Sequence, residues 1–331
     1  MILLFVLFSL ATNAREPFIA WEKIQNPVYA IDDWSVKDAT MIYQEETGDF
    51  YLFFSAFFFV GERVNSHVVG VKTKDWINFS DPLFIWEGEE LGYHGLCSPE
   101  IHYYNDKYIL TYNGWGDKSG KVNQLYYAVS DNLEEWEKHK PLGREVTKDY
   151  RAIDAAIAFQ NETYYLYYKE SRPFGHLRRV DLTRVAFATD LDGPWSFVYN
   201  GYNRFSYRDG TQSNLIHENY QLLKIDDTWH MQVTGYWPHE PYLYRIGGDA
   251  NHKAWWTVWE DGIQQKIQEE AFNTDHRANA AHLQDWRKYD GYFYLLYAGN
   301  TENESFWTRG HNKLGLARSK DLINWEVPPG N

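Results

Sequence analysis

The sequence predicts an all-β protein, a five-bladed β-propeller whose blades are four-stranded antiparallel sheets. Two observations carry this prediction. A short turn sequence that leads into an aromatic residue is repeated along the chain, and a β-hairpin pattern lies upstream of each copy. No helical periodicity of 3.6 residues is sustained anywhere in the 331 residues.

The turn repeat is clearest near the two ends of the chain. Residues 73–79 read TKDWINF and residues 319–325 read SKDLINW, and each copy follows an apolar run. Three looser copies lie between them. The aromatic residues that end the five copies recur at intervals of 57 to 69 residues: Phe79, Trp136, Trp195, Trp256 and Trp325. A unit of this length that repeats along a chain is typical of propellers.

The second repeat is an alternating run, a polar turn and an aromatic run. Residues 39–43 and 50–54 flank the turn at 45–49. The counterparts fall within residues 100–112, 155–168, 219–233 and 282–297. These patterns predict β-hairpins. Each unit then holds a hairpin and the two strands that follow it. Because a blade cannot bury its faces without neighbours, we expect residues 15–331 to form a single domain.

Composition and the N-terminus restrict the compartment and the partners. Residues 1–14 combine an apolar run with small residues, as in a secretory signal peptide, so we expect export to the periplasm or the exterior. The run is too short for a membrane anchor. A formal net charge of −14 argues against nucleic acids and anionic membranes as partners. Cys97 is the only cysteine, which excludes an intrachain disulfide. Oligomeric state stays open.

Acidic residues stand where the innermost strands are expected to begin. These strands line the central channel of a propeller, so their first residues converge on one face. Aligned on the hairpins, four of the five positions are acidic and the fifth is imidazole: Asp38, Glu100, Asp154, Glu218 and His282. Crowded carboxylates repel one another, which favours a functional role. The alternative is that they cap turns or bind a structural cation.

The ends of the second strands return to the same face and should form its rim. Trp115 and Trp237 can offer flat apolar faces to a sugar, while Lys169 and Arg172 can donate hydrogen bonds to hydroxyls. For either tryptophan a place in the core is an equal alternative. Such a rim above an acidic well suits a neutral, hydroxyl-rich ligand.

The blade-start motifs resemble those of glycoside hydrolase family 43, and more distantly families 62, 32, 68 and 117. The motifs are Asn26-Pro-Val28, Asp38-Ala-Thr, Ser98-Pro-Glu100, Ala152-Ile-Asp154, Glu218 and His282. The resemblance implies that Asp38 is the general base, that Asp154 orients and tunes the acid, and that Glu218 is the general acid. It also implies that His282 lies near a water or a structural Ca²⁺ in the channel. No nucleotide cofactor is implied.

Glycoside hydrolysis requires one protonated and one ionised carboxyl group. We expect the charge of Asp154 to raise the pKa of Glu218 and keep it protonated near neutrality. Ala39 and Asn219-Tyr220 depart from the family pattern, so Asp32 or Asp33 stays open as a substitute for Asp38. Glu100 is the second choice for any acidic role.

The sequence therefore predicts a secreted glycosidase that cleaves arabinofuranoside-like or xyloside-like bonds in a plant or algal polysaccharide with inversion. Two alternatives stay open. One is a retaining, fructosidase-like hydrolase on the same fold. The other is a propeller that binds carbohydrate without cleaving it.

Overall fold

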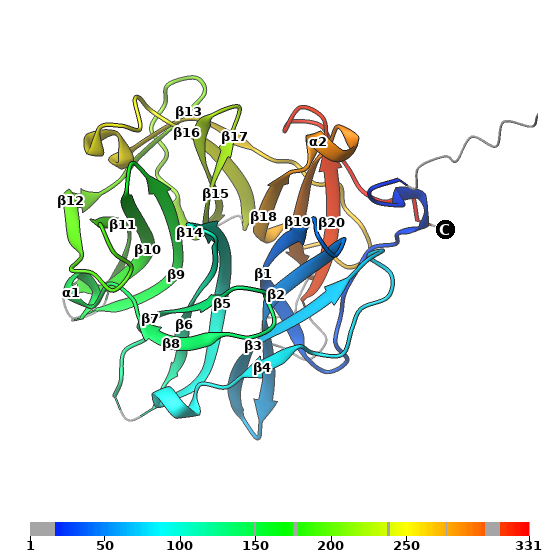
Figure 1. Ribbon diagram of the computed structural model, residues 1–331, viewed down its shortest axis with the longest axis horizontal. Helices are drawn as coiled ribbons and strands as arrows, with labels where there is room; N and C mark the ends of the chain where they lie inside the picture. Colours follow the sequence, from blue (N-terminus) through cyan, green and yellow to red (C-terminus); the bar gives the residue numbers. More distant parts are fainter. Residues whose placement is uncertain are drawn as a thin grey trace, which may run out of the picture.

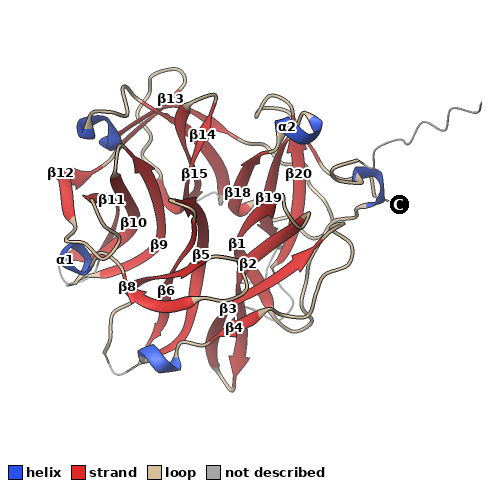
Figure 2. Cartoon of the chain, in the orientation of Figure 1, coloured by secondary structure: helices blue, strands red, loops and turns tan. Residues whose placement is uncertain are grey.

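The computed structural model describes residues 17–118, 120–148, 150–174, 178–236, 239–275, 277–301 and 312–330. Its strands form five blades arranged around a central axis, with only short helical turns at the periphery (Figures 1 and 2). A parallel bridge between Ser66 and Gly95 joins the first two blades into one eight-stranded sheet. The predicted five-bladed β-propeller is confirmed. The expected signal peptide at 1–14 lies outside the described residues. No helix in the described part of the chain is long and apolar enough to cross a membrane.

Each blade is a four-stranded antiparallel sheet in sequence order, and the fourth blade carries one extra strand, β13, parallel to β17. Blade 1 holds β1 (Ser35–Gln44), β2 (Asp49–Val60), β3 (Arg63–Thr73) and β4 (Phe84–Trp86). Blade 2 holds β5 (Tyr93–Tyr104), β6 (Lys107–Asp117), β7 (Leu125–Ser130) and β8 (Glu137–Pro141). Blade 3 holds β9 (Arg151–Gln160), β10 (Thr163–Phe174), β11 (Arg178–Ala188) and β12 (Ser196–Tyr202).

Blade 4 holds β13 (Arg204–Tyr207), β14 (Ile216–Ile225), β15 (Thr228–Tyr236), β16 (Glu240–Ile246) and β17 (Val258–Gln264). Blade 5 holds β18 (Asn279–Asp285), β19 (Phe293–Gly299), β20 (Lys313–Ser319) and β21 (Trp325–Glu326). The helical turns are η1 (Trp21–Lys23), η2 (Glu89–Leu91), α1 (Arg144–Thr147), η3 (Lys253–Thr257) and α2 (Arg287–Asp290). None exceeds five residues, which agrees with the absence of helical periodicity.

The ring is closed by contacts between neighbouring blades. Each innermost strand contacts the next, in the order β1, β5, β9, β14, β18 and back to β1. The hydrophobic core is divided accordingly into five clusters, each spanning one interface between blades. The N-terminal segment strengthens the last interface, because Tyr29 forms an antiparallel bridge with Leu314 of β20 and Asn26 hydrogen-bonds both backbone groups of Leu316. Closure therefore joins the two ends of the chain.

The repeated turn sequences are side-chain-capped turns between the third and fourth strands. Oγ1 of Thr73 accepts the backbone N–H of Trp76 at 3.0 Å, and Oδ1 of Asp75 accepts that of Asn78 at 2.8 Å. Ser319 and Asp321 make the same contacts in blade 5. Hydroxyl and carboxylate side chains favour such local bonds over a continued strand. This explains the spacing of the repeat.

A β-bulge interrupts the innermost strand of every blade. The register against the second strand shifts at the same place in all five hairpins. At each bulge one residue that is not glycine has a φ between 48° and 58°, and these residues are Asp38, Ser98, Asp154, Asn219 and Ala280. A bulge turns two consecutive side chains away from strict alternation. The five innermost strands can therefore each direct a pair of neighbouring residues toward one face.

The bulge conformation predicts an asymmetry between two adjacent alanines. Ala280 has the positive φ and Ala281 does not, and each side chain is only 3% exposed. Both glycine variants lose a buried methyl group, but only at residue 280 does glycine remove a left-handed cost of about 1–2 kcal/mol. We expect Ala280→Gly to destabilise the fold by about 1 kcal/mol less than Ala281→Gly in denaturant titrations. Equal losses of stability in the two variants would contradict backbone strain at residue 280.

Candidate active site

A pocket of about 300 Å³ opens where the bulges of blades 1 to 4 converge. Three buried carboxylates line it: Asp38 of β1, Asp154 of β9 and Glu218 of β14. The structure therefore brings together the three residues that the sequence singled out as catalytic, from three different blades.

The bulges explain why so many functional groups fit in this pocket. Lys37 lines it together with Asp38, and Asn219 lines it together with Glu218, although consecutive residues of a regular strand face opposite sides. This corrects the alignment of the blade starts. The residue equivalent to Asp38 in blade 4 is Asn219, so Glu218 stands one position earlier, and Glu100 and His282 stand two positions after their bulges.

Two of the three pocket carboxylates, Asp38 and Glu218, each have a lysine as a partner. Nζ of Lys37 lies 3.1 Å from Oδ1 of Asp38, which also accepts a hydrogen bond from Nδ2 of Asn219 at 3.1 Å. Nζ of Lys169 donates to Oε2 of Glu218 at 2.7 Å. Ion pairs this deeply buried are strongly destabilised when one partner is removed. The two lysines therefore fix the positions of two of the three acids.

Lys169 departs from a pattern that joins the blades. In blades 1, 2 and 4 a polar side chain near the end of the second strand accepts the bulge N–H of the next blade. Ser55 accepts from Ser98 at 2.7 Å, Asn113 from Asp154 at 3.0 Å and Thr234 from Ala280 at 2.9 Å. Lys169 occupies the same register position in blade 3, and its ammonium group reaches the carboxylate of blade 4 instead. In blade 3 the ammonium group of Lys169 therefore stands where blades 1, 2 and 4 have a structural hydrogen bond to the next bulge.

The protonation states differ from the sequence-based expectation. Burial, followed by the charge of Glu218, raises the pKa of Asp154 to about 6. Burial also acts to raise the pKa of Glu218, but the ammonium groups of Lys169 and Lys37 outweigh it and lower that pKa below the ordinary glutamate value. The expectation that Glu218 is the protonated member was wrong for the free protein. The higher pKa of this pair belongs to Asp154.

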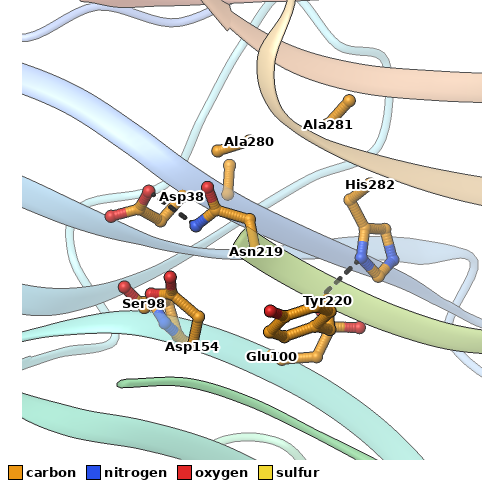
Figure 3. Close-up of a pocket in the computed structure, with 11 residues that line it drawn as sticks. Asp38, Ser98, Glu100, Asp154, Asn219, Tyr220, Ala280, Ala281 and His282 are labelled. Carbon is orange, nitrogen blue, oxygen red and sulfur yellow. Dashed lines mark hydrogen bonds and ion pairs between the residues drawn. The ribbon is translucent and has the colours of Figure 1, made fainter. Parts of the chain in front are cut away.

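Glu100 and His282 line a small cavity in the channel that adjoins the acidic pocket and shares Asp38, Ser98, Asp154 and Asn219 with it (Figure 3). Nδ1 of His282 is 3.2 Å from Oε2 of Glu100 and 3.0 Å from Oγ1 of Thr40. The cavity, of about 20 Å³, is large enough for one water molecule. Neither residue lines the larger pocket. The structure therefore does not place Glu100 and His282, which the sequence aligned with the catalytic acids and offered as substrate-binding residues, in the larger pocket, because both are displaced along the strand.

This channel fits a water better than a calcium ion. Ca²⁺ requires six to eight oxygen ligands. Among the described residues, no group of three or more His, Cys, Asp or Glu side chains is placed to hold a metal. Both ring nitrogens of His282 already have polar neighbours within the channel, Thr40 on one side and Gln221 and Gln284 on the other. The residues present do not support the expected calcium site or His282 as its ligand.

The predicted rim residues have different outcomes. Trp115 and Lys169 line the pocket, as expected. Arg172 does not, because strand alternation in β10 turns it to the other side, where it pairs with Glu170 and stacks on Tyr150. Trp237 lies outside the described residues. Asp32 and Asp33 are exposed and away from the pocket, which leaves Asp38 as the acid of blade 1.

Sequence reasoning missed several polar residues of the pocket. These are Lys37, Arg151, Arg179, Asn219, Tyr236 and His239. Lys37 and Asn219 are neighbours in sequence of predicted catalytic residues, and only knowledge of the bulges would have included them. Arg151 is three positions before Asp154, at the start of β9. No sequence signal distinguished the others from ordinary surface residues.

Comparison with solved structures identifies the fold. No family model and no curated protein matches the chain. CoXyl43, a GH43 β-xylosidase/α-arabinofuranosidase from a compost microbial metagenome, matches with a TM-score of 0.62 at 13% identity, over 90% of this chain and 95% of that one. The chain has a family 43-like propeller fold.

Further structures extend the comparison beyond one enzyme. An α-L-arabinofuranosidase from Lactobacillus brevis matches the family 43-like fold of this chain with a TM-score of 0.62 at 12% identity, covering 92% of this chain and 98% of that one. A structure from the GH130 family of mannoside phosphorylases matches with a TM-score of 0.59 at 15% identity, covering 91% and 88%. At these identities the shared feature is the family 43-like fold.

Proposed function

We propose that this protein is a glycoside hydrolase that removes an arabinofuranoside-like or xyloside-like sugar from a plant or algal polysaccharide with inversion. The observation that carries the proposal is a pocket with three buried carboxylates from three blades, two of which have pKa values shifted in opposite directions. Acid–base cleavage of a glycosidic bond needs carboxyl groups in unlike environments. The fold shared with CoXyl43 supports the same reaction class.

Asp38 is the proposed general base. Lys37 and Asn219 hold its carboxyl group in place, and a carboxylate at this position can take a proton from the attacking water. Asp38 and Glu218 stand on blades 1 and 4, which are not neighbours in the ring. Such a placement favours a separation of about 6.5–9.5 Å, which admits a water between base and acid. This is the reason for proposing inversion.

Asp154 and Glu218 act as a proton-donating pair. Two interacting carboxyl groups titrate together, so the apparent pKa of about 6 belongs to the pair. In the free protein the raised pKa is that of Asp154, which is therefore the more readily protonated member of the pair. When the leaving oxygen of a substrate enters, the pair supplies a proton to it, with Glu218 as the proposed donor. Lys169 then stabilises the carboxylate that forms.

The pair predicts a specific pH dependence. The donor works only while protonated, so kcat/KM, which reports the pKa values of the free enzyme, should fall as the pH rises through about 6. In Asp154→Asn the negative charge beside Glu218 is removed, so the pKa of the proton donor falls. We expect the alkaline limb of the kcat/KM profile to move down by about one pH unit or more. If the alkaline limb of the pH profile did not move in Asp154→Asn, Asp154 and Glu218 would not titrate as a pair.

The reaction class can be tested by screening hydrolysis of pentofuranosides, xylosides, fructosides and galactose-based oligosaccharides. Release of arabinose or xylose supports the proposal. Proton NMR of the first sugar released, read before mutarotation, should show the inverted anomer. A retained anomer would mean that Asp38 attacks carbon directly, as in the fructosidase-like alternative. We also propose that residues 1–14 direct export, which N-terminal sequencing of secreted protein would test.

A further inference from the structure

A second hollow adjoins the acidic pocket on the same side of the propeller. Its volume is about 520 Å³, and it shares Trp115 and Arg151 with the pocket of the three carboxylates. The remaining lining comes from the start of β3, from β5 and β6, and from the loop after β6. A chain-like ligand whose cleaved sugar sits beside Asp38 can therefore continue past Trp115 into this hollow.

The charge of this hollow is opposite to that of the whole protein. Arg63, Lys121, Arg151 and His94 line it, and no carboxylate belongs to its described lining. The whole chain has 46 acidic residues against 32 basic ones. With acids in such excess, most cations near a surface find a carboxylate. Four basic side chains around one carboxylate-free hollow call for a separate explanation.

The three permanent cations of the hollow are held by neutral partners. Nε of Arg63 donates to Oδ1 of Asn65 at 2.9 Å, and Nη1 of Arg151 donates to Oγ of Ser171 at 3.2 Å. Lys121 donates to the carbonyl of Leu91 and lies 4.5 Å from the ring centre of Tyr93. None of the three forms an ion pair with a carboxylate of the described residues. Arg63 interacts with Glu89 only through its electrostatic field, without an ion pair. The three charges can therefore act on a ligand while the positions of the side chains are constrained.

We propose that the hollow is a subsite for an anionic sugar unit, which follows the neutral sugar cleaved in the acidic pocket. The inference rests on the proposed glycosidase function and adds the class of its substrate, a polysaccharide whose unit next to the scissile bond carries a carboxylate or a sulfate ester. Trp115, at the junction, offers a face for stacking against a sugar ring. Arginine and lysine then bind the anionic group through charge-assisted hydrogen bonds.

The proposal predicts binding that depends on two charges in the hollow. The probes are trigalacturonate as a carboxylate ligand, a sulfated galactotetraose as a sulfate ligand, and xylotriose as a neutral ligand. Affinities are measured by calorimetry on the full chain, on the Glu218→Gln background wherever a probe is hydrolysed. We expect one or both anionic probes to bind about tenfold or more tightly than xylotriose. This preference should weaken at high salt, which screens exposed charges.

The double variant Arg63→Gln/Lys121→Gln tests the residues themselves. It should lower the affinity for the preferred anionic probe by about tenfold or more and leave xylotriose within about twofold. The matched control is Lys74→Gln/Lys107→Gln, which removes two charges from the same two blades: Lys74 follows the end of β3 opposite to Arg63, and Lys107 starts β6. This control should leave all three affinities unchanged.

The outcomes separate this proposal from the proposed function. The double variant can lose affinity for the carboxylate probe alone or for the sulfate probe alone. Either result supports the subsite and identifies which anionic group it binds. Xylotriose binding as tightly as both anionic probes, or equal losses in the control variant, would overturn it. If anionic probes bind through Arg63 and Lys121 but no glycoside is hydrolysed, the subsite stands and the hydrolase proposal fails.

Discussion

Replacing Asp38 with Asn should reduce kcat by about 10²- to 10⁴-fold, the usual contribution of a general base. The amide cannot take the proton of the attacking water, yet it keeps the size of the side chain and can still accept the hydrogen bond from Asn219. Substrate affinity should change little. The measurement is steady-state hydrolysis of whichever pentoside the screen identifies, with thermal unfolding as a check on folding.

Asp33→Asn is the matched control for this experiment. Asp33 lies five positions upstream, is exposed and has a positive φ of 64°, a conformation that asparagine tolerates well. Its substitution should leave kcat near the wild-type value. If Asp33→Asn abolished turnover and Asp38→Asn did not, the base would have been assigned to the wrong residue of this segment.

Glu218→Gln should show a loss that depends on the leaving group. In natural saccharides the departing sugar is a poor leaving group whose oxygen must be protonated. Turnover of these substrates should therefore fall by about 10²- to 10⁴-fold. Nitrophenyl glycosides leave readily without a proton and should be affected by about tenfold or less. The glutamine can still accept the hydrogen bond from Lys169, whose ammonium group also lies 3.9 Å from the carboxylate of Asp181, so the fold should be retained with reduced stability.

Binding distinguishes this prediction from the non-catalytic alternative. Calorimetry should detect saccharide binding to Glu218→Gln, and Glu260→Gln on the outer strand β17 of the same blade should leave kcat unchanged. Equal losses for both kinds of substrate would exclude Glu218 as the proton donor. A wild-type protein that binds saccharides but cleaves none would be a carbohydrate-binding propeller.

The five blades could be predicted because their turns and hairpins repeat in sequence. Thr73 and Ser319, for example, cap equivalent turns with their hydroxyl groups, and this chemistry requires particular residue types at particular spacings. The number of strands per blade followed from the hairpin and the two strands after it in each unit. These are local interactions, and local interactions leave a direct trace in the sequence.

The candidate site was predictable only in part, because it depends on where each strand bulges. Asp38 and Asp154 are bulge residues, whereas Glu218 is one position off and Glu100 two. A shift of one residue in a strand changes the face on which a side chain lies. Glu218, one position before its bulge residue, lies in the acidic pocket, whereas Glu100, two positions after its bulge residue, lies in the channel. The pKa of Glu218 likewise depends on Lys169, which reaches it from another blade. Contacts across blades leave no local trace.

The repeated bulge also has a consequence for how such a protein can diversify. Five backbone positions of the same geometry face one end of the ring, and in this chain they carry Asp, Ser, Asp, Asn and Ala. The same left-handed conformation occurs with each of these side chains, although it costs least for Asp and Asn, and three of the five N–H groups are held by a neighbouring blade. The backbone geometry at these positions is therefore kept while the side chain varies. Ser98, which lines the acidic pocket, is the position where a laboratory selection could introduce a new acid, base or ligand.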